Sequence, residues 1–224
     1  MRKHGLDKMM RMQHPETGRE IVMIGMIHIE KPGFFEEIRL YLDSLKREEY
    51  VVFYEGVSRG DVDSMRLDTV LRKFRRVTGI NLDRYYSNEE LFSSGKYTLQ
   101  TLGNLGLTTD RDINVDINYN ELITEYESRY GEIILTDYDR QTGLAEKYKR
   151  RKAGREEYSE WDMTNTIRED AIIEGVLNSH HQKIVLLYGV SHWYALYPPF
   201  MDTGYEVVEG KPYPSWKPKL TKDE

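Results

Sequence analysis

Three short segments of the chain are apolar at almost every position, and each stops at a polar motif. They are residues 21–27, 50–54 and 183–188. Unbroken apolar runs of this length are typical of strands that a sheet buries on both faces. The motifs that end them are, in chain order, Gly25-Met-Ile-His28, Glu55-Gly56 and Gly189-Val-Ser-His192.

Two further segments repeat apolar residues at helical spacing. Residues 33–47 do so through Phe34, Ile38 and Leu42, and residues 162–177 do so through Met163 and Ile167, with Asp162 as the expected N-cap. Strand 21–27, helix 33–47 and strand 50–54 form a β-α-β unit. Because such crossovers join parallel strands, we expect these two strands to be parallel and close neighbours.

These patterns predict an α/β fold with a central mixed, mostly parallel β-sheet flanked by helices. Residues 1–210 are expected to form a single domain, in which residues 58–160 are a largely helical insertion, and residues 211–224 an extended tail. Strand 183–188 belongs in the middle of the sheet, beside one of the other two strands. Residues 8–13 could be an edge strand, and residues 193–201 a short element broken by two prolines.

Composition narrows the functional classes. The 224 residues include no cysteine, which excludes disulfides, thiolate metal sites and cysteine nucleophiles. A net charge of −6 argues against general nucleic-acid binding. No apolar stretch approaches the ~20 residues of a membrane span, and no apolar signal core follows the basic N-terminus. We therefore expect a soluble, cytoplasmic protein, and the sequence does not indicate its oligomeric state.

Charged segments have a plain interpretation. The basic runs at residues 72–76 and 147–155 are expected to be solvated faces. Residues 143–157 are dense in charge and could form a helix, a mobile loop or a lid.

The three strand ends carry the candidate chemistry. His28, Glu55 and His192 each sit where a strand gives way to a loop, and the carboxyl ends of strands are where ligands collect in an α/β sheet. Imidazole and carboxylate are the usual ligands of zinc and similar metals. Glu30 follows His28 by two residues, so it is either a second carboxylate of the site or the start of an acidic helix face.

Two further residues are ambiguous. Arg168 is flanked by Glu169 and Asp170, and by itself this pattern favours an exposed, salt-bridged helix face. Asp116 lies in the segment Asn114-Val-Asp-Ile-Asn118 and is ambiguous in the same way.

With these residues in view, the chain resembles the TraB/TIKI group within the wider erythromycin-esterase/ChaN-like clan. The resemblance spans about residues 21–196. It rests on two Gly-x-x-His motifs, a Glu after the second strand, an Arg in the helix before the last motif, and an Asp in the middle region. The matching residues are Gly25 with His28, Glu55, Arg168, Gly189 with His192, and Asp116.

The resemblance implies an EreA/ChaN-like fold and a mixed set of activities. Some members look like metal-dependent peptidases, some act as esterases with a histidine base and no metal, and some bind haem or have only a regulatory role. In this chain Met26 stands where the group usually has Thr, and Glu169 where it usually has Asn.

The first functional hypothesis is a metal-dependent hydrolase acting on a peptide or another acyl bond. His28, Glu55 and His192 would hold one divalent ion, with manganese, cobalt or zinc all possible. Glu30 or Glu55 could take a proton, and Arg168 would steady an oxyanion or anchor a substrate carboxylate.

Two alternatives stay open. In one, His28 is a general base oriented by Glu55 or Glu30, and activates water against an ester without a metal. In the other, the protein does not turn over a substrate, and the same cleft binds haem, a peptide or another protein.

Overall fold

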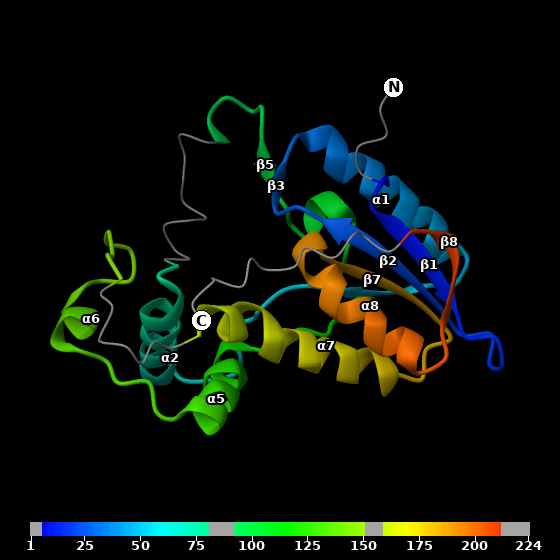
Figure 1. Cartoon of the computed structure of the whole chain (residues 1–224). Coiled ribbons are helices and arrows are strands. Elements are labelled where there is room, and N and C mark those ends of the chain that lie inside the picture. The colour runs from blue at the N-terminus through cyan, green and yellow to red at the C-terminus, as the bar shows by residue number, and fades with distance from the viewer. Residues whose placement is uncertain (1–5, 81–91, 151–158, 212–224) are drawn as a thin grey trace, which may run out of the picture. The chain divides into compact units, whose positions relative to one another are not determined.

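Figure 1 shows a computed structural model of the chain, which describes residues 6–80, 92–150 and 159–211. Contacts divide the chain into two compact units. The first comprises Met1–Glu55, Thr98–Asn114 and Val176–Glu224, and the second comprises Gly56–Tyr97 and Val115–Gly175. Apart from Lys211, the predicted tail at 211–224 lies outside the described residues. None of the described helices is both long enough and apolar enough to cross a membrane.

The first unit is built on a six-stranded sheet with the order β6-β4-β7-β2-β1-β8. The four strands β6, β4, β7 and β2 run parallel, while β1 pairs antiparallel with both β2 and β8. The prediction of a mixed, mostly parallel sheet flanked by helices is therefore confirmed. The strands are β1 (Met9–Gln13), β2 (Glu20–Met26), β4 (Val51–Tyr54), β6 (Ile113–Asn114), β7 (Lys183–Gly189) and β8 (Glu206–Gly210). A separate antiparallel ribbon joins β3 (Ile29–Glu30) to β5 (Thr98–Leu99).

The strand order corrects two expectations. β2 and β4 are parallel, but they are not neighbours, because β7 lies between them and pairs with both. β7 is buried from Ile184 to Gly189, and this burial on both faces accounts for its central position. β1 is not an edge strand, since β8 pairs with its outer side.

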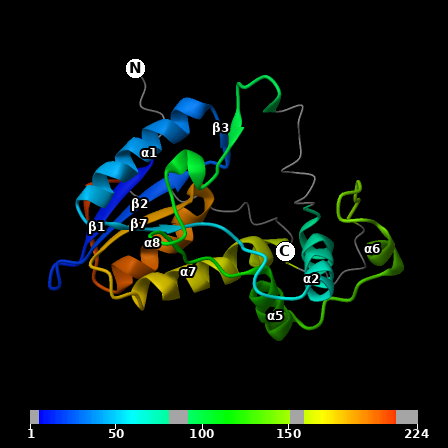
Figure 2. The same cartoon turned by 180° about the vertical axis from the view of Figure 1, so that it is seen from behind.

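Helices cover both faces of this sheet (Figures 1 and 2). α1 (Pro32–Arg47) agrees with the predicted helix 33–47 and buries Ile38 and Leu42 in the same core cluster as Val185 and Leu187. α8 (Trp193–Asp202) lies on the opposite face. It continues through both prolines, so the expectation of a broken element was wrong. The unit also contains two single 3-10 turns, η1 (Gly103–Leu105) and η3 (Val190–His192).

The second unit is helical in its described part. Its elements are α2 (Ser64–Thr78), α5 (Tyr119–Tyr130), α6 (Asp137–Gln141), the π-helical η2 (Asp162–Thr166) and α7 (Ile167–Leu177), whose last two residues belong to the first unit. Asn118 caps α5 with a capping box. The predicted N-cap Asp162 instead lies inside a helical segment, and its backbone N–H donates to the Ser159 hydroxyl at 3.1 Å. Ser159 therefore has the capping role.

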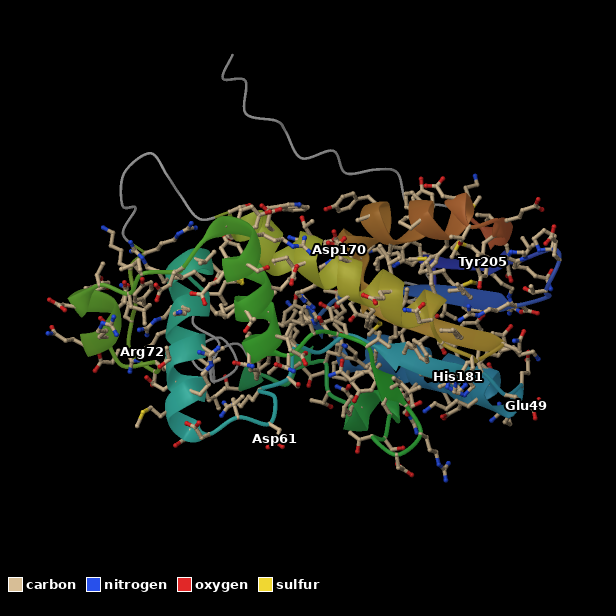
Figure 3. The ribbon with its side chains drawn as sticks, turned by 90° about the horizontal axis from the view of Figure 1, so that it is seen from below. Glu49, Asp61, Arg72, Asp170, His181 and Tyr205 are labelled. Carbon is tan, nitrogen blue, oxygen red and sulfur yellow. The ribbon has the colours of Figure 1, made fainter. Side chains whose placement is uncertain are left out.

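The basic run on α2 is buried, which contradicts the expected solvated face. Arg75 is 1% exposed, and its guanidinium donates to the carbonyls of Gly143 at 2.7 Å and Thr142 at 2.8 Å. Arg72, labelled in Figure 3, donates to the Thr142 carbonyl as well. Backbone carbonyls therefore accept hydrogen bonds from two of the four cations, while Lys73 pairs with Glu127 and Arg76 with Asp139. Residues 143–150 form no helix or strand, and the rest of the predicted charged segment, 151–157, lies outside the described residues.

Candidate functional site

Strand register brings the three predicted motifs to one edge of the sheet. Met26 at the end of β2 is paired with Gly189 of β7, and Tyr54 at the end of β4 is paired with Leu187 of β7. The backbone N–H of Glu55 then donates to the Leu187 carbonyl at 3.2 Å. Because the three strands are parallel, the residues that follow them emerge on the same side.

Glu55 is the centre of the site. Its side chain is 5% exposed, and its Oε2 accepts a hydrogen bond from the backbone N–H of Gly189 at 2.6 Å. Its Oε1 faces two imidazoles, with Nε2 of His28 at 3.6 Å and Nε2 of His192 at 3.7 Å. The two histidines therefore share one carboxylate oxygen and are closer together than a helix diameter of ~10 Å.

The two histidines differ in access to solvent. The His28 side chain is 51% exposed, whereas that of His192 is 5% exposed. The His192 ring also lies edge-on to the Tyr188 ring, with centroids 6.0 Å apart. A molecule arriving from solvent would therefore meet His28 first, while His192 forms part of the wall behind Glu55.

The distances fit neither direct hydrogen bonds nor a bound ion as they stand. Separations of 3.6 and 3.7 Å exceed the usual length of an N–H···O hydrogen bond. Two donors held at ~2.1 Å from a tetrahedral ion are about 3.4 Å apart. One carboxylate and two imidazoles are a donor set that zinc, cobalt and manganese accept. The chemistry of the donors therefore fits a divalent ion, and their spacing is slightly wide for one.

This small excess in spacing matters. Among residues 6–80, 92–150 and 159–211, no group of three or more His, Cys, Asp or Glu side chains is arranged to hold a metal ion as it stands. His28, Glu55 and His192 are thus three potential donors around one point, and coordination requires them to move closer together.

The motif glycines allow close packing. A Cβ at Gly189 would lie 3.0 Å from Glu55 Oε2 and 3.4 Å from Cδ2 of His192. A Cβ at Gly25 would lie 3.2 Å from Cγ2 of Val190, in the second motif. Neither glycine has a positive φ, so a side chain is disfavoured here by tight contact rather than by backbone conformation. The sequence had indicated glycines at the strand ends but not what they contact.

Glu30 accepts a local backbone hydrogen bond. It lies in β3, and its Oε1 accepts a hydrogen bond from the backbone N–H of Lys31 at 3.0 Å, just before α1 begins. Glu30 and Lys31 also line a cavity of about 620 Å³ together with Ile27 and Phe34. Its role as a second carboxylate of the site stays a prediction.

Arg168 and Asp116 form an ion pair inside the second unit. Nη2 and Nε of Arg168 donate to the two oxygens of Asp116 at 2.5 and 3.1 Å, and the Asp116 side chain is completely buried. Asp116 Oδ2 also accepts the backbone N–H of Gly56 at 3.2 Å. Gly56 follows Glu55 directly in the sequence, where the chain passes from the first unit into the second. The pairing replaces the exposed helix face that the residues alone had suggested for Arg168.

No known protein family, curated protein or solved structure matches this chain.

Proposed function

We propose that the protein is a hydrolase of peptide or other acyl bonds, related to the TraB/TIKI group on an EreA/ChaN-like fold. The observation that carries the proposal is the shared Glu55 oxygen, which two imidazoles face at 3.6 and 3.7 Å beyond three adjacent strands. The Gly-x-x-His motifs, the Glu after the second strand and the Arg168–Asp116 pair agree with the resemblance. In this proposal His28, Glu55 and His192 form the reactive centre.

The first form of the proposal includes a divalent ion. His28, Glu55 and His192 would hold manganese, cobalt or zinc, which would supply Lewis-acid polarisation of a carbonyl and an acidified water. Gly189 holds one Glu55 oxygen and so directs the other toward the imidazoles. The half-exposed His28 forms the solvent side of the centre, where a substrate can approach.

The remaining residues have supporting roles. Glu55 Oε1 is placed to accept a proton between the two imidazoles, and Glu30 stays the alternative acceptor. Arg168 acts through Asp116, because its guanidinium is 11% exposed and committed to that carboxylate. We infer that Arg168 positions Gly56 rather than binding an oxyanion itself.

A second form needs no ion, and the different exposure of the two histidines favours it. His28 would be the general base, Glu55 would orient its ring, and the buried His192 would hold Glu55 in place. Each histidine then has a separate role, and the slightly wide spacing requires no closure.

Hydrolysis assays on fluorogenic peptides and on p-nitrophenyl esters test both forms. Chelator-treated protein should be inactive in the first form and regain activity with manganese, cobalt or zinc. In the second form activity should survive the chelator. In either form His28→Ala should lose activity, whereas His180→Ala, which removes an exposed histidine, should not. The proposal fails if the wild-type protein neither hydrolyses these substrates nor binds an added ion, and His28→Ala changes nothing.

A further inference from the structure

The ribbon of β3 and β5 continues to His28. Ile29 is paired with Leu99 and Glu30 with Thr98 in antiparallel register. The next step of this ladder places Gln100 opposite His28, and the backbone N–H of Gln100 donates to the His28 carbonyl at 2.8 Å. Directly opposed residues of an antiparallel pair project on the same face, with Cβ atoms ~5 Å apart. The Gln100 side chain is therefore the cross-strand neighbour of the His28 imidazole.

The backbone around Gln100 is held on both sides. The Leu99 carbonyl accepts a hydrogen bond from Nδ2 of Asn104 at 2.7 Å. The Thr101 N–H donates to Oδ1 of the same asparagine at 2.9 Å. Gln100 is thus fixed between two anchored residues while its N–H binds His28.

The side-chain carbonyl of Gln100 lacks a donor. In the described part of the chain its Oε1 is buried and accepts no hydrogen bond. A buried acceptor without a donor costs free energy, so such an atom calls for an explanation. The imidazole across the ladder is the neighbouring group that can carry a ring N–H.

We propose that the Gln100 side-chain carbonyl accepts the Nδ1–H of His28 in the working site, which makes Gln100 a positioning residue. Nε2 of His28 faces Glu55, so Nδ1 is the ring nitrogen left for a second partner, and it lies on the side of the ring nearer the backbone. A proton held on Nδ1 leaves the Nε2 lone pair directed toward the centre. Histidine ligands commonly donate their second ring N–H to a carbonyl in this way.

A neutral amide suits this role. It accepts a hydrogen bond without adding a charge beside Glu55 and without competing as a strong ligand. The inference deepens the proposed function and rests on it for the role of His28, but the contact between Gln100 and His28 can be tested without any activity.

The test uses the full chain labelled with ¹⁵N-histidine, with and without zinc, and the His28→Ala spectrum assigns the signal. The wild-type protein should show His28 protonated at Nδ1, with slow exchange of that proton with water. Gln100→Leu should accelerate the exchange at least tenfold, because the acceptor is gone. Gln100→Glu retains an acceptor oxygen and should keep the slow exchange. Gln182→Leu changes an exposed glutamine and should leave the His28 signal unaltered.

Zinc affinity and stability supply independent measurements. Competition with a chelator should show zinc bound 10- to 100-fold more weakly by Gln100→Leu. Its melting temperature should fall only slightly, because the His28 side chain is half-exposed and water can replace the lost acceptor. The proposal is overturned if Gln100→Leu is folded and its His28 Nδ1 signal equals that of the wild type. If the wild type binds no zinc, the metal-dependent function fails, while the zinc-free spectra still decide the role of Gln100.

Discussion

Glu55 is a buried carboxylate at the centre of the site. Replacing it with glutamine removes the negative charge and keeps nearly the same shape. In Glu55→Gln the amide oxygen can still accept the Gly189 N–H, but the negative charge facing His28 and His192 is lost. We expect hydrolysis to fall by about 10²- to 10⁴-fold with little change in melting temperature. Rate measurements and thermal unfolding on the same preparation check this.

Glu16→Gln is the matched control, because Glu16 is exposed and lies in the turn before β2. It should retain the wild-type rate. If Glu55→Gln also retains it, Glu55 has no part in the chemistry and the proposed centre is wrong.

Gly189 is where the site tolerates least added volume. In Gly189→Ala the new Cβ would lie 3.0 Å from Glu55 Oε2, so the carboxylate must shift. The backbone at φ −50° and ψ 130° suits alanine, which isolates the effect of the contact. We expect a loss of about 1–3 kcal/mol in the free energy of unfolding, together with lower activity, as measured by urea denaturation and by rate.

Gly33→Ala provides the comparison, since a Cβ there meets nothing within 4 Å. Its free energy of unfolding should match or slightly exceed that of the wild type. Equal stability of the two variants would mean that Gly189 is not under steric pressure from Glu55.

At the scale of elements, a buried carboxylate joins α6 to α2. Asp139 is 1% exposed, and its oxygens accept from the hydroxyl of Tyr148 at 2.6 Å and from the N–H and hydroxyl of Thr136 at 2.8 Å. Arg76 Nε lies 3.5 Å from the same carboxylate. Burial alone would raise the pKa of Asp139, but these hydrogen bonds and Arg76 hold it below the usual 3.8.

The lowered pKa of Asp139 fixes the direction in which its contribution to stability changes with pH. The folded protein holds Asp139 ionised more strongly than the unfolded chain, so its contribution is complete above pH ~4 and is lost as the pH falls through the lowered folded pKa. In Asp139→Asn the free energy of unfolding at neutral pH should fall by about 3 kcal/mol. Its loss of stability below pH ~4 should also be smaller than that of the wild type.

Denaturant unfolding at several pH values measures both effects. Asp137→Asn, an exposed change in the same short helix, should keep the wild-type stability and pH profile. If Asp139→Asn is as stable as the wild type and loses as much stability below pH ~4, the carboxylate does not join α6 to α2.

The elements that follow from local patterns were predictable, and those that depend on pairing were not. The apolar runs predicted β2, β4 and β7, and helical spacing predicted α1. The apolar run at 183–188 also predicted the central position of β7, which the strand order confirms, whereas its place between β2 and β4 depends on pairing and not on chain order.

The same distinction applies to the candidate site. His28, Glu55 and His192 were found because strand ends can be read locally. The Gly189 hydrogen bond to Glu55 and the position of Gln100 opposite His28 depend on register between segments far apart in the chain. Arg75 was expected to be solvated because its acceptors are backbone carbonyls, and the residue types in a sequence do not reveal where carbonyls will lie.

At the scale of the whole molecule, His28, Glu55 and His192 all belong to the first compact unit. If they bind a divalent ion, an ion at 100 times its dissociation constant should stabilise the native state by about 2.7 kcal/mol. Hydrogen exchange followed by mass spectrometry should then show protection concentrated at the ends of β2, β4 and β7. Peptides from α2 and α5 should change less, because they lie in the second unit.

The same experiment on His28→Ala should show no added protection. Protection spread evenly over both units in the wild type would place ion binding elsewhere and remove the metal-dependent form of the proposal.

The close approach of Gly25 to Val190 has a consequence for how this site can change during evolution. Because the glycine of the first motif packs on a residue inside the second, the two motifs are coupled positions. A methyl group gained at position 25 requires Lys8 and Val190, whose side-chain atoms are 3.1 and 3.2 Å away, to give by a few tenths of an ångström, and the loss of volume at position 190 eases this. The order in which substitutions arrive therefore matters, and drift at one histidine motif is restrained by the other even though more than 150 residues separate them in the sequence.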